Sequence, residues 1–367
     1  MAISTKTLRI FDSQINYQKH KAEIDSAIQA VLNSGSYING KEVGEFEKKL
    51  AKYLGVQHVI GCANGTDALQ LAYMALNLEK EDEIILPAFG YVSVAECAVL
   101  LGLKPVFVDV NPDTFNIDVS QVLKAITSKT KAIVPIHLYG QCGDLQTLKM
   151  LAENNRIKLI EDNAQSVGSQ RGLFGQIGTT SFFPTKNLGA FGDGGAVYTN
   201  DSSLAERVRS IANHGQKSKY TFNEIGINSR LDTIQAAILS VKLNYLDKEH
   251  ESRKKNALEY KKRLSDLEGI VLPTEKIANK HIYHQFTIKV LHGKRDKLQQ
   301  FLAESGIQSV VYYPNTISSQ KPYFVDKNYP VAELLVNQVL SIPVHSGITK
   351  EDIQFISEKM HYFSANY

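Results

Sequence analysis

The stretch HVIGCANGTDALQLAYMALNLEKEDEIILPAF, residues 58–89, decides the fold class. It opens with a short apolar run rich in β-branched residues, continues with helical periodicity over 66–78, and returns to an apolar run at 83–89. A strand, a helix and a second strand in this order are typical of a sheet that is covered by helices.

The same alternation continues toward residue 245. Further strands are expected at 104–110, 131–140, 158–163, 179–184 and 195–200, and further helices at 93–102, 119–126, 144–154, 203–213 and 231–245. Nearly all of these strands are apolar, which suits burial on both faces of a mostly parallel sheet. Residues 179–184 and 195–200 flank a glycine-rich turn, so we expect them to pair in this sheet. The predicted fold is α/β, a three-layer sandwich around a mostly parallel mixed sheet.

The character of the sequence changes after residue 245. A charged amphipathic helix is expected over 246–268, and after it the chain mixes short strands with helices. The strands are expected at 285–290 and 309–314, and the helices at 294–304 and 350–359. We therefore predict a large domain over residues 1–245, including an N-terminal arm, and a smaller α+β domain over residues 246–367.

Composition excludes several classes of protein. Hydrophobic residues make up 43% of the 367 residues, charged residues 22%, and the formal charge is only +3. The basic residues are scattered among acids and no apolar run approaches the roughly 20 residues of a membrane span, so we expect neither nucleic acid nor membrane as a partner. The N-terminus does not resemble a secretory signal, which predicts a cytoplasmic protein. Cys62, Cys97 and Cys142 lack metal-ligand spacing, so no disulfide framework and no metal site are expected.

A candidate anion site follows the first strand. Asn64, Gly65, Thr66 and Asp67 stand between that strand and the next helix. Free N–H groups at a helix N-terminus, a glycine that permits close approach and a hydroxyl donor together suit a phosphate group. The alternative is ordinary helix capping, for which Asn and Thr are also common.

A second set of polar residues, Glu161 to Gln165, follows an apolar strand at the end where open α/β sheets bind ligands. A pyridoxal cofactor needs a carboxylate beside its ring nitrogen, and Asp162 can supply it. Gln165 can bind the ring hydroxyl oxygen. The alternative is an acidic strand end followed by a turn.

The most specific segment is SFFPTKNLG, residues 181–189, which leads into the glycine-rich GDGG of 192–195. A lysine that forms a Schiff base must be partly unprotonated, and apolar neighbours promote this by removing water. Lys186 follows an aromatic pair and a proline and precedes glycines that permit tight turns. Lys186 can therefore meet a cofactor aldehyde while Ser181 holds the phosphate.

In order and spacing these segments resemble the DegT/DnrJ/EryC1/StrS family of sugar aminotransferases, which have the aspartate aminotransferase fold (fold type I). The resemblance runs along nearly the whole chain. The segments that carry it are 37–55 (YINGKEVGEFEKKLAKYLG), 62–70 (CANGTDALQ), 87–96 (PAFGYVSVAE), 138–141 (LYGQ), 161–166 (EDNAQS), 181–197 (SFFPTKNLGAFGDGGAV) and 228–237 (NSRLDTIQAA). The motifs most resemble those of enzymes that aminate C-3 of a sugar.

The resemblance implies pyridoxal 5′-phosphate as the cofactor. It implies that Lys186 holds the cofactor and shuttles the proton, that Asp162 pairs with the pyridine nitrogen, and that Gln165 contacts the ring oxygen. Tyr91 fits the place of an aromatic that covers the ring face.

The same resemblance implies that Gly65, Thr66 and Ser181 bind the phosphate. Asn228 matches a residue that reaches the phosphate from the neighbouring subunit, which predicts a homodimer with shared active sites.

Substrate contacts are also implied. Arg230 is expected to approach the sugar or its carboxylate across the subunit interface, with an ion pair to Asp232 or another acid as the alternative. Tyr313 and His345 match residues that line the sugar pocket in relatives, although buried tyrosines and histidines often serve packing instead. His137 also has both interpretations.

The implied reaction moves an amino group from glutamate to a keto group of a nucleotide-linked sugar. The expected acceptor is C-3 of a dTDP-3-keto-6-deoxyhexose or of a UDP-3-keto-N-acetylglucosaminuronate, for polysaccharide precursors such as those of lipopolysaccharide O-antigen. The alternative is C-4 amination of a UDP- or dTDP-4-keto-6-deoxyhexose. Dehydrating relatives carry histidine in place of the lysine, and a non-catalytic regulator that binds cofactor or nucleotide sugar would lack Lys186 or Asp162. Neither change is present.

Overall fold

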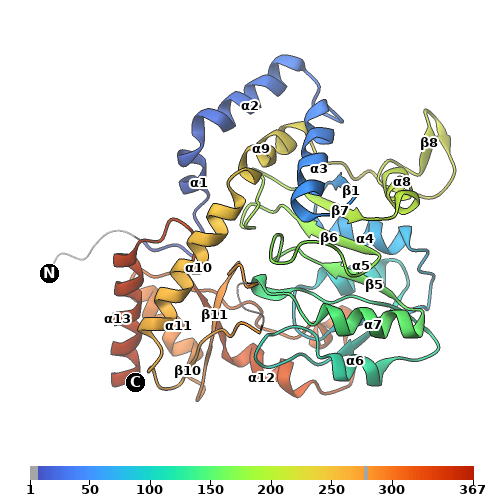
Figure 1. The fold of residues 1–367 in the computed structure, drawn as a ribbon. Coiled ribbons are helices and arrows are strands. Elements are labelled where there is room, and N and C mark those ends of the chain that lie inside the picture. The colour runs from blue at the N-terminus through green and yellow to red at the C-terminus, as the bar shows by residue number, and fades with distance from the viewer. Residues whose placement is uncertain (1–6, 277–279) are drawn as a thin grey trace.

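A seven-stranded sheet forms the centre of the larger part of the molecule in the computed structural model, which describes residues 7–276 and 280–367 (Figure 1). The strand order is β1-β7-β6-β5-β4-β2-β3. β7 is antiparallel to both of its neighbours, and the other strand pairs are parallel. The strands are β1 (His58–Cys62), β2 (Glu83–Pro87), β3 (Lys104–Val108), β4 (Thr130–Ile133), β5 (Lys158–Asp162), β6 (Ile177–Ser181) and β7 (Gly195–Thr199). The predicted mostly parallel mixed sheet, including the pairing of β6 with β7, is confirmed.

Helices cover both faces of this sheet because successive side chains of each strand point to opposite sides. In β2, Ile84 and Leu86 join the buried cluster that contains α4 and α5, while Ile85 joins the cluster that contains α6 and α7. α3 and α9 pack at the β1 end of the sheet. The helices are α3 (Lys41–Leu54), α4 (Gly65–Ala75), α5 (Ser93–Leu100), α6 (Val119–Ala125), α7 (Leu145–Asn155), α8 (Ser202–Ile211) and α9 (Thr233–Leu243). The predicted three-layer α/β sandwich is confirmed.

A second, three-stranded antiparallel sheet has the order β10-β11-β12. Its core joins β11 and β12 to α10, α11 and α13, and it also contains Leu8, which pairs with Ile307. The elements are α10 (Leu246–Arg263), β10 (Ile270–Val271), β11 (Phe286–Val290), α11 (Arg295–Glu304), α12 (Pro330–Gln338), β12 (Val339–Ile342) and α13 (Lys350–Asn366). α12 packs with the core of the large sheet. The domain boundary between 245 and 246 stays a prediction, and both Leu8 and α12 make contacts across it.

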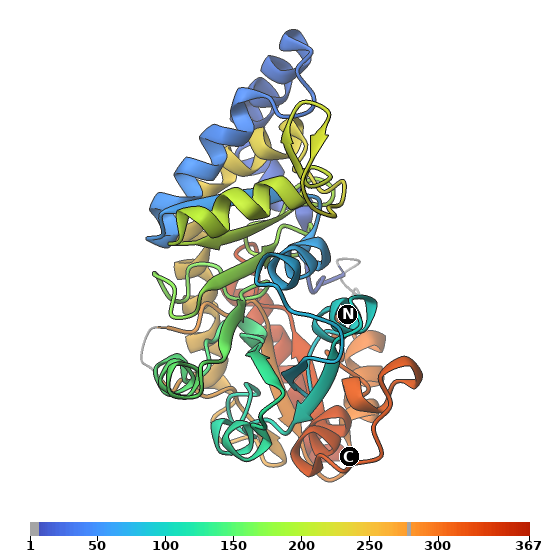
Figure 2. The same ribbon diagram turned by 90° about the vertical axis from the view of Figure 1, so that its right-hand side faces the viewer.

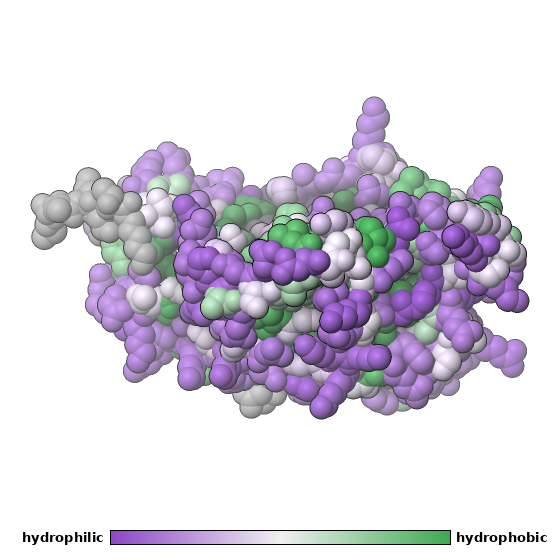
Figure 3. Space-filling model, turned by 90° about the horizontal axis from the view of Figure 1, so that it is seen from above, coloured by the Kyte–Doolittle hydropathy of each residue, from purple (hydrophilic) through white to green (hydrophobic). Residues whose placement is uncertain are grey.

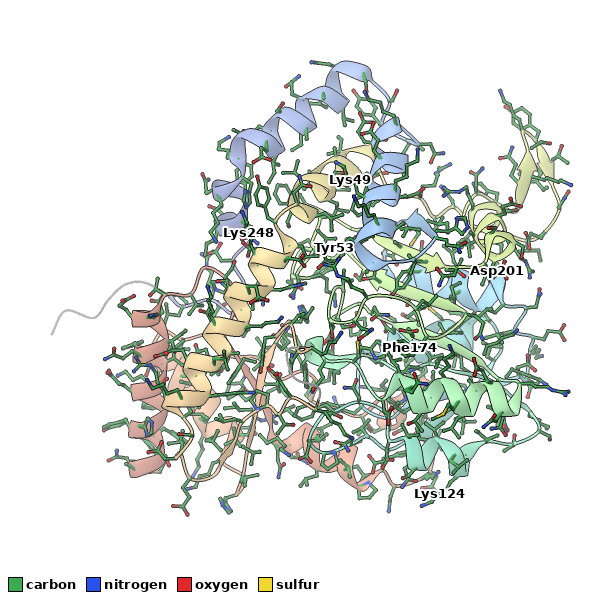
Figure 4. The ribbon with its side chains drawn as sticks, in the orientation of Figure 1. Lys49, Tyr53, Lys124, Phe174, Asp201 and Lys248 are labelled. Atoms are coloured by element: carbon green, nitrogen blue, oxygen red, sulfur yellow. The ribbon has the colours of Figure 1, made fainter. Side chains whose placement is uncertain are left out.

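Side-chain contacts connect the two parts. Tyr53 on α3 lies on the side facing α10 (Figure 4), and its hydroxyl donates to the Asp247 carboxylate over 2.7 Å. Arg171 also donates to Asp247, over 3.1 Å. Lys124, by contrast, projects from α6 away from the molecule. The body of the protein is thus continuous from the large sheet to α10.

The remaining elements lie at the periphery of the fold. β8 and β9 form a hairpin that projects from the body beyond α8 (Figures 1 and 2). The elements are α1 (Ser13–Lys19), α2 (Lys21–Ser34), β8 (Gln216–Ser218) and β9 (Thr221–Phe222), with three 3₁₀ turns at Leu138–Gly140, Ile317–Ser319 and Lys321–Tyr323. No helix in the described ranges 7–276 and 280–367 has both the length and the apolarity needed to span a membrane.

Two predicted strands are wrong in extent. The strand expected over 131–140 ends at Ile133, because Pro135 has no N–H for a ladder and the chain enters a 3₁₀ turn at Leu138. The strand expected over 309–314 is reduced to one bridge between Val310 and Ser341. The helix expected over 246–268 ends five residues earlier, at Arg263. The helix expected over 350–359 extends to Asn366. The helices α1, α2, α3 and α12 and the strands β8, β9, β10 and β12 were not predicted.

Candidate active site

Lys186 lies in the turn that joins β6 to β7. Backbone hydrogen bonds close this turn: Phe182 N–H donates to Gly194, and Ala190 N–H donates to Phe182, both over 2.7 Å. At Gly189 a Cβ atom would lie 2.4 Å from the Pro184 carbonyl oxygen, so only glycine permits this approach. The glycines after Lys186 therefore let the turn pack tightly on itself.

Two side chains of α9 hold the far end of the turn. Gln235 Oε1 accepts from Phe191 N–H over 2.8 Å, and the Lys242 amine donates to the Gly189 carbonyl oxygen. Lys242 also stands 5.4 Å from the centre of the Phe191 ring. Neither residue was predicted from the sequence, because the sequence of α9 does not indicate that its side chains reach this turn.

The Lys186 amine is electrostatically suited to nucleophilic chemistry. Burial lowers its pKa from 10.5 to about 8, and the charge of Asp162 opposes the shift. Roughly one such amine in ten is then unprotonated at pH 7. Part of the side chain remains accessible, as a lysine that reacts with a small molecule requires.

Asp162 is the last residue of β5 and is buried. Its Oδ1 accepts from Ala164 N–H over 3.0 Å. Burial raises the pKa of this carboxyl, while the Ala164 hydrogen bond and the charge of Lys186 act in the opposite direction. A cation placed beside Asp162 would favour its ionised form further.

The candidate phosphate residues meet at the start of α4. A Cβ atom at Gly65 would lie 2.6 Å from Ser181 Cβ, so the glycine lets the helix N-terminus approach the end of β6. The Asn64 side chain accepts from Asp67 N–H over 2.8 Å, which confirms it as the cap. The N–H groups of Gly65 and Thr66 have no partner inside the helix. The Thr66 hydroxyl lies 3.0 Å from that of Ser93.

Gln165 connects this site to an aromatic wall. Its Oε1 accepts from Tyr139 N–H over 2.8 Å, and its Nε2 donates to the Tyr313 hydroxyl over 3.1 Å. The rings of Tyr91 and Tyr313 are 5.8 Å apart, and Tyr91 is 52% exposed. One N–H of Gln165 is left for a ligand.

Lys186, Gln165 and Ser181 line one small cavity. Asp162 joins them through the pairing of β5 with β6, since Asp162 stands opposite Thr179, and Gly65 joins them through Ser181. The structure therefore brings together the predicted cofactor residues of a single chain.

Asn228 and Arg230 are placed elsewhere. Arg230 lines a different, open cavity of about 890 Å³ between α3, α8 and the segment before α9, and the exposed Asn228 bridges Asn213 at its edge. Among the described residues Arg230 has no ion-pair partner, so the alternative pairing with Asp232 is not observed. Neither Lys186 nor Asp162 lines this cavity.

Both ring nitrogens of His345 are occupied by backbone groups. Nε2 lies 3.1 Å from the Arg9 carbonyl oxygen, and Gly347 N–H donates to Nδ1 over 3.2 Å. Burial lowers the pKa of His345 to about 4. The role of His345 in substrate binding stays a prediction.

His137 is fully buried behind Asp162. Its Nδ1 accepts from Gly143 N–H over 3.3 Å, and its Nε2 lies 3.7 Å from a Glu161 carboxylate oxygen. His137 Nε2 is buried and forms no hydrogen bond to the described residues, so both interpretations of His137 stay predictions.

The sequence pattern of the DegT/DnrJ/EryC1/StrS aminotransferase family matches residues 18–361. The chain belongs to this family. Pyridoxal phosphate is the cofactor of the family, and solved neighbours hold the cofactor PMP or a ketimine intermediate. The present site suits such a cofactor: it combines a lysine of lowered pKa, a buried carboxylate and a helix N-terminus beside a serine.

Several relatives are similar to this chain over nearly their whole length. A pleiotropic regulatory protein of Geobacillus stearothermophilus is 42% identical, over 98% of this chain and 99% of its own. The UDP-2-acetamido-2-deoxy-3-oxo-D-glucuronate aminotransferase of Pseudomonas aeruginosa is also 42% identical, over 95% and 98%. The dTDP-3-amino-3,6-dideoxy-alpha-D-galactopyranose transaminase of Aneurinibacillus thermoaerophilus is 39% identical, over 95% and 97%.

Solved structures have the same fold. DesV of S. venezuelae in complex with a ketimine intermediate superposes with a TM-score of 0.95 at 35% identity, covering 99% of this chain and 100% of the other. NtdA of Bacillus subtilis with bound cofactor PMP superposes with a TM-score of 0.91 at 31% identity, covering 95% and 82%. This protein therefore has the fold of a pyridoxal-phosphate aminotransferase.

Proposed function

We propose that this aminotransferase transfers an amino group from glutamate to the C-3 keto group of a nucleotide-linked sugar. The observation that carries the proposal is the amine of Lys186, whose pKa is lowered to about 8 by removal from water, next to the Asp162 carboxylate at the mouth of the large sheet. The names of the similar aminotransferases from Pseudomonas aeruginosa and Aneurinibacillus thermoaerophilus both describe sugars modified at position 3.

Each residue of the site has a proposed task. When bound, pyridoxal phosphate supplies an aldehyde carbon for the amino group and a ring that withdraws electrons. Lys186 holds the cofactor and, once released from it, moves a proton at its Nζ. Asp162 keeps the ring nitrogen charged, and Gln165 donates its free N–H to the ring oxygen. Gly65 and Thr66 bind the phosphate together with Ser181, and Tyr91 covers the ring.

The assignments of the amino donor and of the sugar carrier are supported by different relatives. A Bacillus subtilis relative, 34% identical, is named a 3-oxo-glucose-6-phosphate:glutamate aminotransferase, which favours glutamate as the donor here. The carriers differ among the relatives, being UDP in one name and dTDP in another. Both acceptors predicted from the sequence, a dTDP-3-keto-6-deoxyhexose and a UDP-3-keto-N-acetylglucosaminuronate, therefore stay in the proposal.

We further propose a homodimer with shared sites, in which Asn228 and Arg230 reach the partner's cofactor and sugar. Arg230 has a cavity beside it and no acid partner among the described residues. Large apolar side chains are exposed at the end of α2 and on the β8–β9 hairpin, and Figure 3 shows hydrophobic patches on the face seen from above. Exposed apolar groups of this kind are Leu32, Tyr37, Ile38, Tyr220, Phe222 and Ile225. We propose that a second copy of the chain buries these exposed apolar side chains.

The rival functions have less support. The name of the Geobacillus stearothermophilus relative describes a regulator, but the present chain retains both Lys186 and Asp162. C-4 amination is disfavoured because the sugars named above are all modified at position 3. Tyr313 and His345 as sugar contacts, the cytoplasmic location and the part in O-antigen synthesis stay predictions.

The test begins with the purified protein and pyridoxal phosphate. A visible absorbance band should form, and glutamate should bleach it. The aminated enzyme is then offered 3-keto and 4-keto sugars, each on UDP and on dTDP, together with 3-oxo-glucose 6-phosphate. We expect rapid return of the band with a 3-keto nucleotide sugar. A protein that stays colourless, or one that reacts only with oxo acids, would refute the proposal.

A further inference from the structure

Asn187, the neighbour of Lys186, is hydrogen-bonded to a buried histidine of the C-terminal part. Asn187 Oδ1 lies 3.0 Å from His284 Nδ1. His284 precedes β11 and is only 6% exposed. Because an amide oxygen is purely an acceptor, this contact places the histidine proton on Nδ1.

The backbone around His284 is held firmly. The buried Arg253 of α10 donates to the carbonyl oxygens of Tyr283 and His284, over 3.2 and 3.3 Å. Gly140 packs so closely that a Cβ atom there would lie 2.8 Å from His284 N. These contacts fix the position of the His284 backbone beside the Lys186 turn.

His284 stays neutral in this setting. Burial lowers the pKa of its imidazole well below 6.5, and the nearby charges of Lys186 and Arg253 lower it further. With the proton on Nδ1, Nε2 is an acceptor, and the amide nitrogen of Gln285 lies 3.5 Å from it. The histidine can thus donate to Asn187 without adding a positive charge beside Lys186.

The other end of the Asn187 amide has no protein partner. Its Nδ2 is buried and forms no hydrogen bond to the described residues. A buried donor left unpaired costs free energy, and such groups in native proteins call for an explanation. Asn187 lines a cavity of about 10 Å³ together with Lys186, Gln165 and Ser181. This space has room for about one water, so Asn187 borders the candidate cofactor residues directly.

We propose that Asn187 is a further binding residue of this site, whose Nδ2 donates to an acceptor oxygen of the bound small molecule, and that His284 is the positioning residue that orients it. The acceptor is an oxygen with negative charge, either the ring oxygen of the cofactor or a carboxylate oxygen of the amino donor. The inference rests on the proposed function, because that function supplies both molecules.

The experiment compares Asn187→Leu, which keeps the branched shape of the side chain but removes its donor and its acceptor, with Ser309→Ala. Ser309 also carries a buried, unpaired side-chain atom but belongs to the segment beside α11. Apoenzyme of each full-length variant is titrated with pyridoxal phosphate alone, and the loaded enzyme is then titrated with glutamate. Loss of one hydrogen bond to a charged oxygen should weaken the affected step roughly tenfold.

The two arms separate the sources of the oxygen. If the dissociation constant of pyridoxal phosphate is larger in Asn187→Leu than in wild type, the contact is assigned to the cofactor oxygen. An unchanged cofactor constant with weaker glutamate binding assigns it to the donor carboxylate. If both constants stay within twofold of wild type, or change no more than in Ser309→Ala, the proposal is wrong. Should Asn187→Leu fail to fold, Asn187→Ser replaces it in the same two titrations.

A second pair of variants tests the part of His284. In His284→Gln an amide N–H remains to donate to Asn187, whereas His284→Leu offers none. The measured quantity is the rise in melting temperature caused by pyridoxal phosphate or glutamate, which a purely structural defect leaves unchanged. We expect His284→Leu to reduce this rise and His284→Gln to restore most of it. Equal rises in both variants and wild type would overturn the positioning role.

These failures are distinguishable from failure of the proposed function. If wild-type protein neither binds pyridoxal phosphate nor reacts with glutamate, the function itself is refuted. If wild type does both and the Asn187 variants match it, only the present inference falls.

Discussion

Polar side chains at the strand ends of the large sheet keep groups free for a ligand. Polar side chains in the C-terminal segment around residues 312–347 are already hydrogen-bonded within the protein. Around the large sheet, Lys186 keeps an amine of lowered pKa at an accessible position, and Gln165 retains a free N–H. In the C-terminal segment, the polar groups are hydrogen-bonded within the chain. Both nitrogens of His345 face backbone groups, and the Tyr313 hydroxyl accepts from Gln165. A group that is already paired must give up a partner before it can bind a ligand, so the two regions should respond differently to mutation.

The largest effect is expected at Lys186. Lys186→Ala removes the amine that is placed to hold the cofactor and to move the proton, so turnover should fall by roughly 10³-fold or more. Visible absorbance of the protein after addition of pyridoxal phosphate is the second measurement, and it should vanish. Lys149→Ala, which changes an exposed lysine of α7, is the control and should behave as wild type. A variant that keeps both colour and turnover would contradict the assignment.

Asp162→Asn should have the next largest effect, a loss of roughly 100-fold in turnover, because the charge beside the cofactor ring is removed. The variant also tests the electrostatics of Lys186. The free amine is the reactive form, so capture of pyridoxal phosphate by apoenzyme should accelerate as pH rises through about 8. Because Asp162 raises this pKa, Asp162→Asn should shift the midpoint to a lower pH. A midpoint that stays or moves upward would show that the two groups are not coupled.

Mixing two inactive variants tests the shared site. If Arg230 serves the partner's site, a mixed dimer of Lys186→Ala with Arg230→Ala contains one intact site. After unfolding and refolding together in equal amounts, about a quarter of wild-type activity should return, since half of the dimers are mixed and each has one of two sites intact. No recovery, with dimers verified by light scattering and Arg230→Ala inactive by itself, would place Arg230 in the site of its own chain.

The smallest effect on catalysis is expected at His345. Its pKa is about 4 in the folded chain, below the 6.5 of an exposed histidine, so the unfolded chain binds more protons between these values. Stability is therefore lost as pH falls from 6.5 toward 4, by about 2 kcal/mol at pH 5. His345→Gln cannot take up this proton and should lose that much less stability between pH 7 and pH 5 in urea unfolding. If it instead raised the KM for the sugar tenfold, the contrast between the two regions would break.

The apolar pattern of the strands explains which parts of the fold were predictable. Strands buried on both faces are apolar along their length, and seven of them with the intervening helices were placed from this pattern alone. The prediction failed where backbone geometry overrode composition: Pro135 ends β4 early, and Val310 is the only residue of the apolar 309–314 segment that pairs with β12. A short apolar run does not say whether a partner strand lies beside it.

By itself, the sequence determined the α/β class and pointed to Lys186, Asp162, Gln165 and Ser181 as candidate cofactor residues. This was possible because strand ends of one parallel sheet come together whatever the rest of the chain does. Only the tertiary structure decided how the remaining polar groups are paired. Lys242 and His284 reach the Lys186 turn from α9 and from the start of β11, more than fifty residues away in the chain. Such contacts depend on how helices and strands pack, and local sequence carries no signal for them.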